Sequence, residues 1–122
     1  MIDRQRVLII DEDRRTVDEL QEKFNQSGFE AEVALSGPVG LSIIEERYMA
    51  AAVLSAKIAN EETWELVKML KESDPKLPVV LFNAPKVKGL SKVARRAGAA
   101  KFIATPADAQ TILSETVKVM RN

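Results

Sequence analysis

Five short apolar runs alternate with five amphipathic stretches along this chain, and this alternation limits its fold more than any other feature. The apolar runs lie at 7–10, 30–34, 51–54, 79–82 and 101–103. Val7–Ile10 is apolar without interruption, which is typical of a strand buried on both faces. Strands that alternate with helices form a parallel sheet with right-handed crossovers. The sequence therefore predicts an α/β fold: a five-stranded parallel sheet, doubly wound as (βα)5.

Capping and stop signals set the limits of the predicted helices. The first runs from Asp13 to Gln26, with Val17, Leu20 and Phe24 on its buried face, and the third spans 61–73, with Trp64, Val67 and Leu70 on one stripe. The second opens at Ser36 and Gly37–Pro38, and the spacing of Leu41, Ile44 and Tyr48 predicts that they are buried. The fourth spans 88–97 before Gly98, and the last runs from Asp108 to about Met120.

Length and composition exclude several classes of protein. The 122 residues have the size of one domain, which we take to span 1–122. The absence of cysteine excludes disulfides and thiolate metal sites, and the absence of histidine excludes a Ser-His-Asp triad. The chain begins with charged residues and lacks an apolar stretch of about 20 residues, so a cytoplasmic location is expected.

Charge is unevenly distributed although the formal net charge is zero. Residues 11–32 carry eight acids and three bases, whereas 75–107 carry seven bases and no acid. A basic stripe on and before the fourth predicted helix comprises Lys86, Lys88, Lys92, Arg95 and Arg96. It is either a solvated face or a docking surface for an acidic protein. Nucleic acid is disfavoured as a partner, because no set of aromatic side chains accompanies the stripe and the total charge is zero.

The residues that follow the strands are the candidates for function, because ligands of open parallel sheets bind beyond the carboxyl ends of the strands. Asp11, Glu12 and Asp13 follow the first strand, and Ser55 and Lys57 follow the third. Asn83 follows the fourth strand, and Thr105 follows the fifth.

Three segments resemble the receiver domains of response regulators. The run 7–13 (VLIIDED) resembles the opening strand and acid cluster of that family, and 96–100 (RAGAA) resembles the stretch before its last strand. The segment 103–106 (IATP) resembles the end of that strand, where the family usually has Lys-Pro. The resemblance extends from Arg6 to Met120. It implies the flavodoxin-like receiver fold and a role in two-component, phosphorelay-type signal transduction, without enzymatic activity.

The resemblance also assigns roles to positions in this sequence. Asp11 and Glu12 match the acids that bind magnesium, and Phe102 matches an aromatic residue that changes rotamer on activation. Ser55 stands where the family has its phospho-accepting aspartate. Asn83 stands where the family has Ser or Thr, and Thr105 stands where it has Lys.

These departures change the expected chemistry. An acyl phosphate requires a carboxylate, and a serine hydroxyl is a weak nucleophile without an adjacent base. A lysine in a pocket without its aspartate would be poorly paired, and Thr105 avoids that situation. The sequence therefore predicts a pseudo-receiver with a degenerate phospho-acceptor pocket formed by Asp11, Glu12, Ser55, Lys57, Asn83 and Thr105.

Several alternatives stay open at individual positions. Asp11 and Glu12 either hold magnesium weakly, which would be the only cofactor, or simply flank the start of a helix. Lys57 is a candidate to fold back and pair with them in place of the ion. Ser55 either accepts phosphate from a serine kinase or closes a strand, and Phe102 is either core or a moving signal residue.

Three functions compete at this stage. The first is a phosphorylation-independent receiver domain that acts through protein contacts, with an acidic partner or as a self-dimer. In receiver domains the surface from the fourth to the fifth helix usually makes such contacts. The second is a receiver that is phosphorylated at a non-standard residue. The third is a nucleotide-binding α/β enzyme domain, which is disfavoured because acids, rather than glycines, follow the first strand.

Overall fold

Five strands and five helices alternate from the start to the end of the computed structural model, which describes residues 4–57 and 60–121. The order is β1 (Arg6–Ile10), α1 (Arg14–Gln26), β2 (Glu30–Ala34), α2 (Gly37–Glu46), β3 (Ala51–Ser55), α3 (Glu61–Ser73), β4 (Val79–Ala84), α4 (Leu90–Ala97), β5 (Lys101–Ala104) and α5 (Ala109–Val119). The predicted sequence of elements is confirmed.

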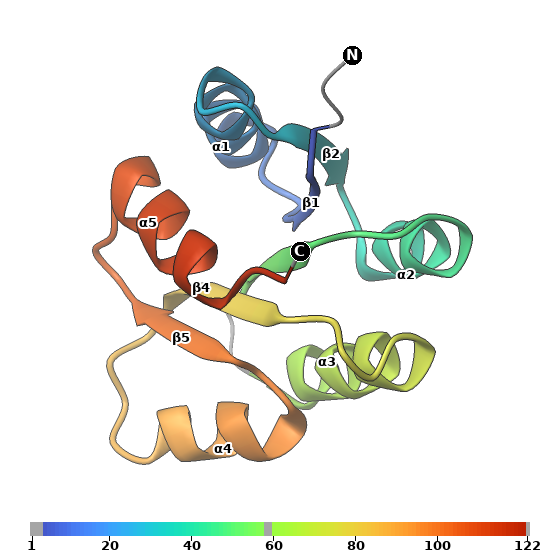
Figure 1. The fold of residues 1–122 in the computed structure, drawn as a ribbon. Helices are drawn as coiled ribbons and strands as arrows, with labels where there is room; N and C mark the ends of the chain where they lie inside the picture. Colours follow the sequence, from blue (N-terminus) through green and yellow to red (C-terminus); the bar gives the residue numbers. More distant parts are fainter. Residues whose placement is uncertain (1–3, 58–59, 122) are drawn as a thin grey trace.

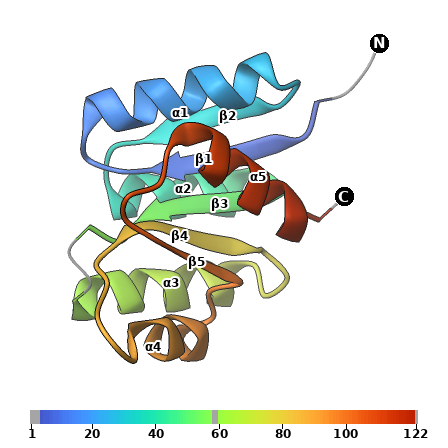
Figure 2. The same ribbon diagram turned by 90° about the vertical axis from the view of Figure 1, so that its left-hand side faces the viewer.

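The strands form one parallel sheet in the order β2-β1-β3-β4-β5. Helices α1 and α5 cover one face, and α2, α3 and α4 cover the other (Figure 1). The chain moves from β1 outward to β2 and then crosses back to β3, so the order reverses beside β1. A crevice is expected at such a reversal, beyond the carboxyl ends of the strands. The loops after β1, β4 and β5 lie together at that edge, on the left of Figure 2.

The side chains of the uninterrupted apolar run of β1 pack into two hydrophobic cores, one on each face of the sheet. Leu8 and Ile10 point into the cluster beneath α2, α3 and α4, while Val7 and Ile9 point into the cluster beneath α1 and α5. Side chains alternate between the faces of a strand, so a strand covered on both sides needs apolar residues at every position. All four of these side chains are at most 2% exposed.

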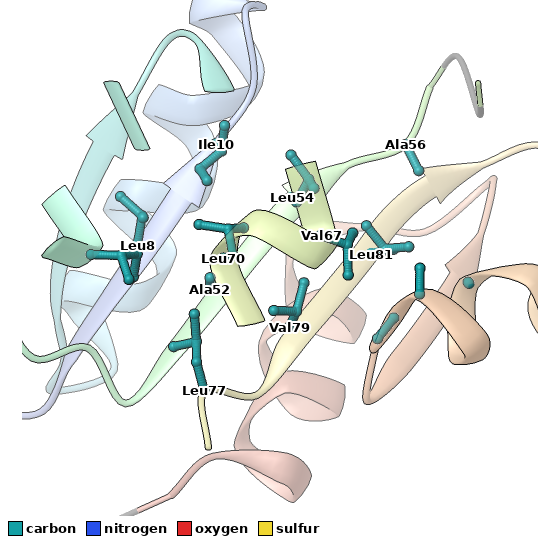
Figure 3. Packing of buried hydrophobic residues seen from close by; sticks show 14 of the residues in the cluster. Leu8, Ile10, Ala52, Leu54, Ala56, Val67, Leu70, Leu77, Val79 and Leu81 are labelled. Carbon is teal, nitrogen blue, oxygen red and sulfur yellow. The ribbon is translucent and has the colours of Figure 1, made fainter. Parts of the chain in front are cut away.

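The core beneath α3 joins the central strands to the helix layer. Figure 3 shows Leu8, Leu54 and Val79 from three neighbouring strands near Val67 and Leu70 of α3. The small residues of β3 allow this close approach, and the predicted burial of Val67 and Leu70 is confirmed. Trp64, predicted on the same stripe, is only partly buried at its edge.

Two helix starts near the carboxyl edge of the sheet follow the predicted capping. The Asp13 carboxylate accepts a hydrogen bond from the Arg15 N–H at 3.1 Å, and Asp108 accepts one from the Thr111 N–H at 2.8 Å. A second bond from the Thr16 hydroxyl is the main reason that the pKa of Asp13 is lowered. These caps fix the points at which the chain leaves the sheet and enters α1 and α5.

The structure corrects the predicted limits of two elements. Helix α4 begins at Leu90, not at residue 88, because a turn precedes it and Gly89 has a left-handed backbone with φ 85°. Strand β4 continues past Phe82 to Ala84. Leu81 pairs with Phe102 and Ala84 pairs with Ala104. Between these pairs β4 has one residue more than β5, which is a β-bulge.

The predicted burial of Tyr48 is wrong. Helix α2 ends at Glu46, and the Tyr48 side chain beyond it is 55% exposed. The guanidinium of Arg121 lies over its ring, 4.4 Å from the centroid. Arg121 also donates hydrogen bonds to the Asp74 carboxylate and the Met49 carbonyl, so it ties the end of α5 to the base of the sheet.

Within 4–57 and 60–121, none of the helices combines the length and the apolar character that crossing a bilayer requires.

Candidate functional site

The predicted site residues lie at the carboxyl edge of the sheet, but the structure divides them between separate places. Asp11, Glu12, Ser55 and Lys57 line one cleft of about 650 Å³ between α2 and α3. Asn83 lines a different hollow, between α1 and α5. Thr105 is exposed beyond β5, lines neither hollow, and donates its N–H to the Ala84 carbonyl at 2.9 Å.

Asp11 is the buried carboxyl of the cleft, with 7% of the residue exposed. Burial raises the pKa of Asp11, because a carboxylate loses hydration there. A hydrogen bond from the Asp13 N–H to Oδ1, at 3.2 Å, opposes this rise. The positive charge of Lys57 and the Ser55 hydroxyl also lower the pKa, by smaller amounts.

Ser55 ends β3 beside Asp11. Its Oγ is buried and has no hydrogen-bond partner that meets normal geometry, although it lies near enough to influence the Asp11 carboxyl. A buried hydroxyl without a partner is unusual and invites a functional explanation. The sequence has no histidine, and the carboxyl whose pKa the Ser55 hydroxyl affects is that of Asp11, so Asp11 is the neighbouring group placed to act as a base.

Lys57 is exposed at the mouth of the cleft. Its charge lowers the pKa of both Asp11 and Asp13. None of the ion pairs among residues 4–57 and 60–121 includes it, so it acts across a gap rather than by contact. The pairing of Lys57 with Asp11 and Glu12 stays a hypothesis, while the positive charge of Lys57 acts on Asp11 and Asp13.

The donor set of this cleft does not fit a tight magnesium site. Mg²⁺ requires near-octahedral oxygen ligands, and it gives up its bound water only reluctantly, in exchange for strong anionic ligands. In the described part of the chain, no three acidic side chains gather so that they could hold a metal. Ser55 supplies a neutral hydroxyl, and Lys57 adds a positive charge where a cation would bind.

Asn83 has an unusual backbone. Its φ of 57° is left-handed, and it is the only residue other than glycine in the described ranges with a positive φ. Asparagine tolerates this conformation better than most residues. The left-handed backbone of Asn83 coincides with the extra residue of β4. Asn83 and Phe82 both line the hollow between α1 and α5.

Phe102 of β5 is half-buried and packs at the margin of the core beneath α3 and α4. This position agrees with a packing role. The predicted rotamer change stays a prediction.

The basic stripe of the sequence forms an exposed surface. Lys86, Lys88, Lys92, Arg95 and Arg96 are all exposed on α4 and the loop before it, and we call this set the basic α4 surface. Sequence reasoning missed that Val87 and Val93, at 59% and 42% exposure, lie among these charges. The surface is therefore apolar as well as basic, a combination more typical of a docking face than of a purely solvated one.

The cleft itself, which we call the α2–α3 cleft, was also missed. Its apolar walls come from Ile10, Leu41, Leu54, Leu66 and Met69, on two strands and two helices. Helical spacing assigns such residues to a core, and no local pattern shows that α2 and α3 leave a gap between them. Asp11 and Lys57 thus lie at the polar end of a largely apolar cleft.

Comparison with known proteins agrees with this architecture. The family described as "Response regulator receiver domain" matches residues 7–117. The photosynthetic apparatus regulatory protein RegA of Rhodobacter capsulatus is 26% identical over 106 residues, which cover 87% of this chain and 58% of RegA. The transcriptional regulatory protein PcoR of Escherichia coli is 25% identical, over 96% of this chain and 52% of PcoR. The chain thus spans little more than half the length of these relatives.

Solved structures share the fold. A CheY-like receiver domain protein from Methanospirillum hungatei JF-1 has a TM-score of 0.85 at 23% identity, and covers 95% of this chain and 93% of its own. The chemotaxis response regulator CheY4 of Vibrio cholerae has a TM-score of 0.86 at 16% identity, and covers 97% and 100%. Because the family match spans nearly the whole sheet and its helices, this chain belongs to the response regulator receiver domains of two-component signalling.

Proposed function

We propose that this receiver domain is a pseudo-receiver, which signals through protein contacts without phosphorylation of an aspartate. The observation that carries the proposal is Ser55 at the end of β3, where the family's acceptor aspartate is expected. Its hydroxyl cannot form an acyl phosphate. Thr105 supports the proposal, because it leaves the edge of the sheet without the lysine that would pair with a phosphoryl group.

The same proposal includes independence from magnesium. A receiver that takes up phosphate needs a divalent cation to neutralise the transferred group. The donors around Asp11 do not fit that ion, and Lys57 already supplies positive charge to Asp11 and Asp13. We therefore expect the fold to be complete without a metal.

We further propose that the basic α4 surface is the docking face. Receiver domains interact with other proteins, and here the exposed Val87 and Val93 lie among five uncompensated basic side chains. None of these five takes part in the ion pairs of the described residues. An acidic protein or a second copy of the chain, bound on the side of α4 and α5, fits this chemistry better than nucleic acid.

An NMR titration tests the loss of the phospho-switch. The amide spectrum is recorded with magnesium alone and then with added beryllofluoride, which mimics an aspartyl phosphate. We expect the amides of Asp11, Ser55, Asn83 and Phe102 to stay unchanged. The matched control is Ser55→Asp combined with Thr105→Lys, which should respond. A concerted shift of the four amides in the unaltered chain would contradict the proposal.

A second candidate is phosphorylation on Ser55 itself, and it is favoured by one observation. Asp11 lies beside the hydroxyl, and its raised pKa makes it a better base than an ordinary carboxylate. Incubation with acetyl phosphate or a serine kinase, followed by intact mass measurement, separates the two candidates. A phosphoryl adduct that survives acid and is absent from Ser55→Ala would establish this second function.

The remaining predictions concern the setting of the domain. Receiver domains are in general signalling modules rather than enzymes, and we propose the same here. RegA and PcoR are described as regulatory proteins, and their matched portions leave room for further segments. That this chain acts in the cytoplasm stays a prediction.

A further inference from the structure

We infer that the α2–α3 cleft is the binding partner of the basic α4 surface of a second copy of this chain, so that molecules associate head to tail. This inference rests on the proposed docking role of the basic α4 surface and names what that surface binds. It joins two features of this structure, an acidic cleft with apolar walls and a basic helix face with exposed valines.

The cleft carries the charge that the α4 surface needs. Its lining includes four acids, Asp11, Glu12, Glu62 and Glu65, against the single base Lys57. Glu12, Glu62 and Glu65 are exposed, so their carboxylates are free to meet cations at the rim. A basic helix would therefore find an attractive potential at this edge of the sheet.

The apolar parts also correspond. Leu41 from α2 and Leu66 and Met69 from α3 wall the cleft, and Met69 is 40% exposed. Val87 and Val93 project from the α4 surface, at 59% and 42% exposure. Insertion of these valines between the helices would remove both apolar surfaces from water, while the surrounding charges set the orientation.

The contact has to form between molecules. Helix α3 lies between α2 and α4 in the layer on one face of the sheet (Figure 1). The α4 surface therefore faces away from the cleft of its own molecule. Two different surfaces meet in such a contact, so each bound pair still presents one free cleft on one molecule and one free α4 surface on the other, and further copies can add.

The chain's charge agrees with self-association. Its formal net charge is zero, so no long-range repulsion keeps copies apart. One helix face against one cleft is at the small end of specific interfaces, which bury about 1,200 Å² or more. We therefore expect weak, reversible association that is visible at millimolar protein concentration and low salt.

Sedimentation equilibrium of charge variants tests the inference. The unaltered chain should show a weight-average mass that rises beyond a dimer with concentration. It should fall towards the monomer when ionic strength is raised from about 0.01 M to about 1 M, since the screening length drops from about 30 Å to about 3 Å. Glu62→Lys/Glu65→Lys and Lys92→Glu/Arg95→Glu should each weaken association at least about tenfold.

Two further variants control for net charge and for folding. Glu45→Lys/Glu46→Lys changes two exposed acids of α2 that do not line the cleft, and it gives the same net charge as the cleft variant. It should associate like the unaltered chain. The fourfold variant that combines both reversals restores opposite charges across the contact, and it should associate again.

The outcomes separate this inference from the proposed function. A fourfold variant that stays monomeric, or an unaltered chain that is monomeric at low salt, overturns the head-to-tail contact. Association that is lost in Lys92→Glu/Arg95→Glu but kept in Glu62→Lys/Glu65→Lys also overturns it. That last result would support the proposed docking role of the α4 surface with a different partner face. The beryllofluoride titration is independent of all of them.

Discussion

Replacement of Ser55 by aspartate tests how the cleft treats a second carboxylate. Ser55 Oγ is buried without a hydrogen-bond partner, and Asp11 beside it is 7% exposed with a raised pKa. Two carboxylates at about 5 Å, with an effective dielectric constant of about 20, repel by about 3 kcal/mol. The charge of Lys57 offsets part of this repulsion. We therefore expect Ser55→Asp to lower the free energy of unfolding by about 2–3 kcal/mol at pH 8.

Magnesium should reverse this loss. The variant places a second carboxylate beside Asp11, where the unaltered cleft has the Ser55 hydroxyl, and an ion that binds only the folded state adds about 2.7 kcal/mol at one hundred times its dissociation constant. The unaltered chain should gain little from the same concentration. Ser55→Asn is the matched control, because it has nearly the same shape as aspartate but no charge.

Urea unfolding followed by circular dichroism, with and without magnesium, measures these changes. The carboxyl pair should have a raised pKa in the folded state, so the loss is complete above that pKa, shrinks as pH falls and one carboxyl is protonated, and vanishes below the pKa of the unfolded chain. The reasoning is refuted if Ser55→Asn loses as much stability as Ser55→Asp. It is also refuted if magnesium stabilises the unaltered chain as much as the variant.

Three smaller changes test other parts of the structure. Asp11→Asn should raise the free energy of unfolding at neutral pH, because the pKa of Asp11 is raised in the folded state. In urea titrations at about pH 3, below the folded and the unfolded pKa, this gain over the unaltered chain should vanish. Arg121→Ala, which removes hydrogen bonds to Asp74, should cost about 1–3 kcal/mol in the same assay, whereas a change within error would show that the contact is solvated. Gly40→Ala would place a Cβ 2.5 Å from Cδ1 of Ile10, so thermal unfolding should show a loss of about 1–3 kcal/mol, and an unchanged midpoint would mean that α2 moves freely on β1.

Local sequence patterns predicted most of the fold. The apolar run of β1 and the caps at Asp13 and Asp108 are signals within a few residues, and each was confirmed where it was predicted. Errors occurred where a local pattern was ambiguous. Tyr48 kept the helical spacing of Leu41 and Ile44, but α2 had already ended at Glu46.

The site was less predictable, because it depends on the direction of side chains at strand ends. Alternation along a strand predicts these directions only while the register is regular. At Asn83 the left-handed backbone and the extra residue of β4 break the alternation, and the side chain lines the hollow between α1 and α5. Ser55 and Asn83 lie near the carboxyl ends of neighbouring strands, and yet Ser55 lines the α2–α3 cleft and Asn83 lines the hollow between α1 and α5.

Asp11 shows why an acid cluster after the first strand is, by itself, weak support for a metal site. Its Oδ1 accepts a hydrogen bond from the Asp13 N–H, and its own N–H donates to the Ala34 carbonyl, so it shapes the turn from β1 towards α1. Asp13 then caps that helix. The turn after β1 and the start of α1 thus explain the positions of Asp11 and Asp13 without any bound ion. In the proposed pseudo-receiver, the positions that decide the chemistry are Ser55 and Lys57, which bring a hydroxyl and an ammonium group to a place where phosphate transfer would need a carboxylate and room for a cation.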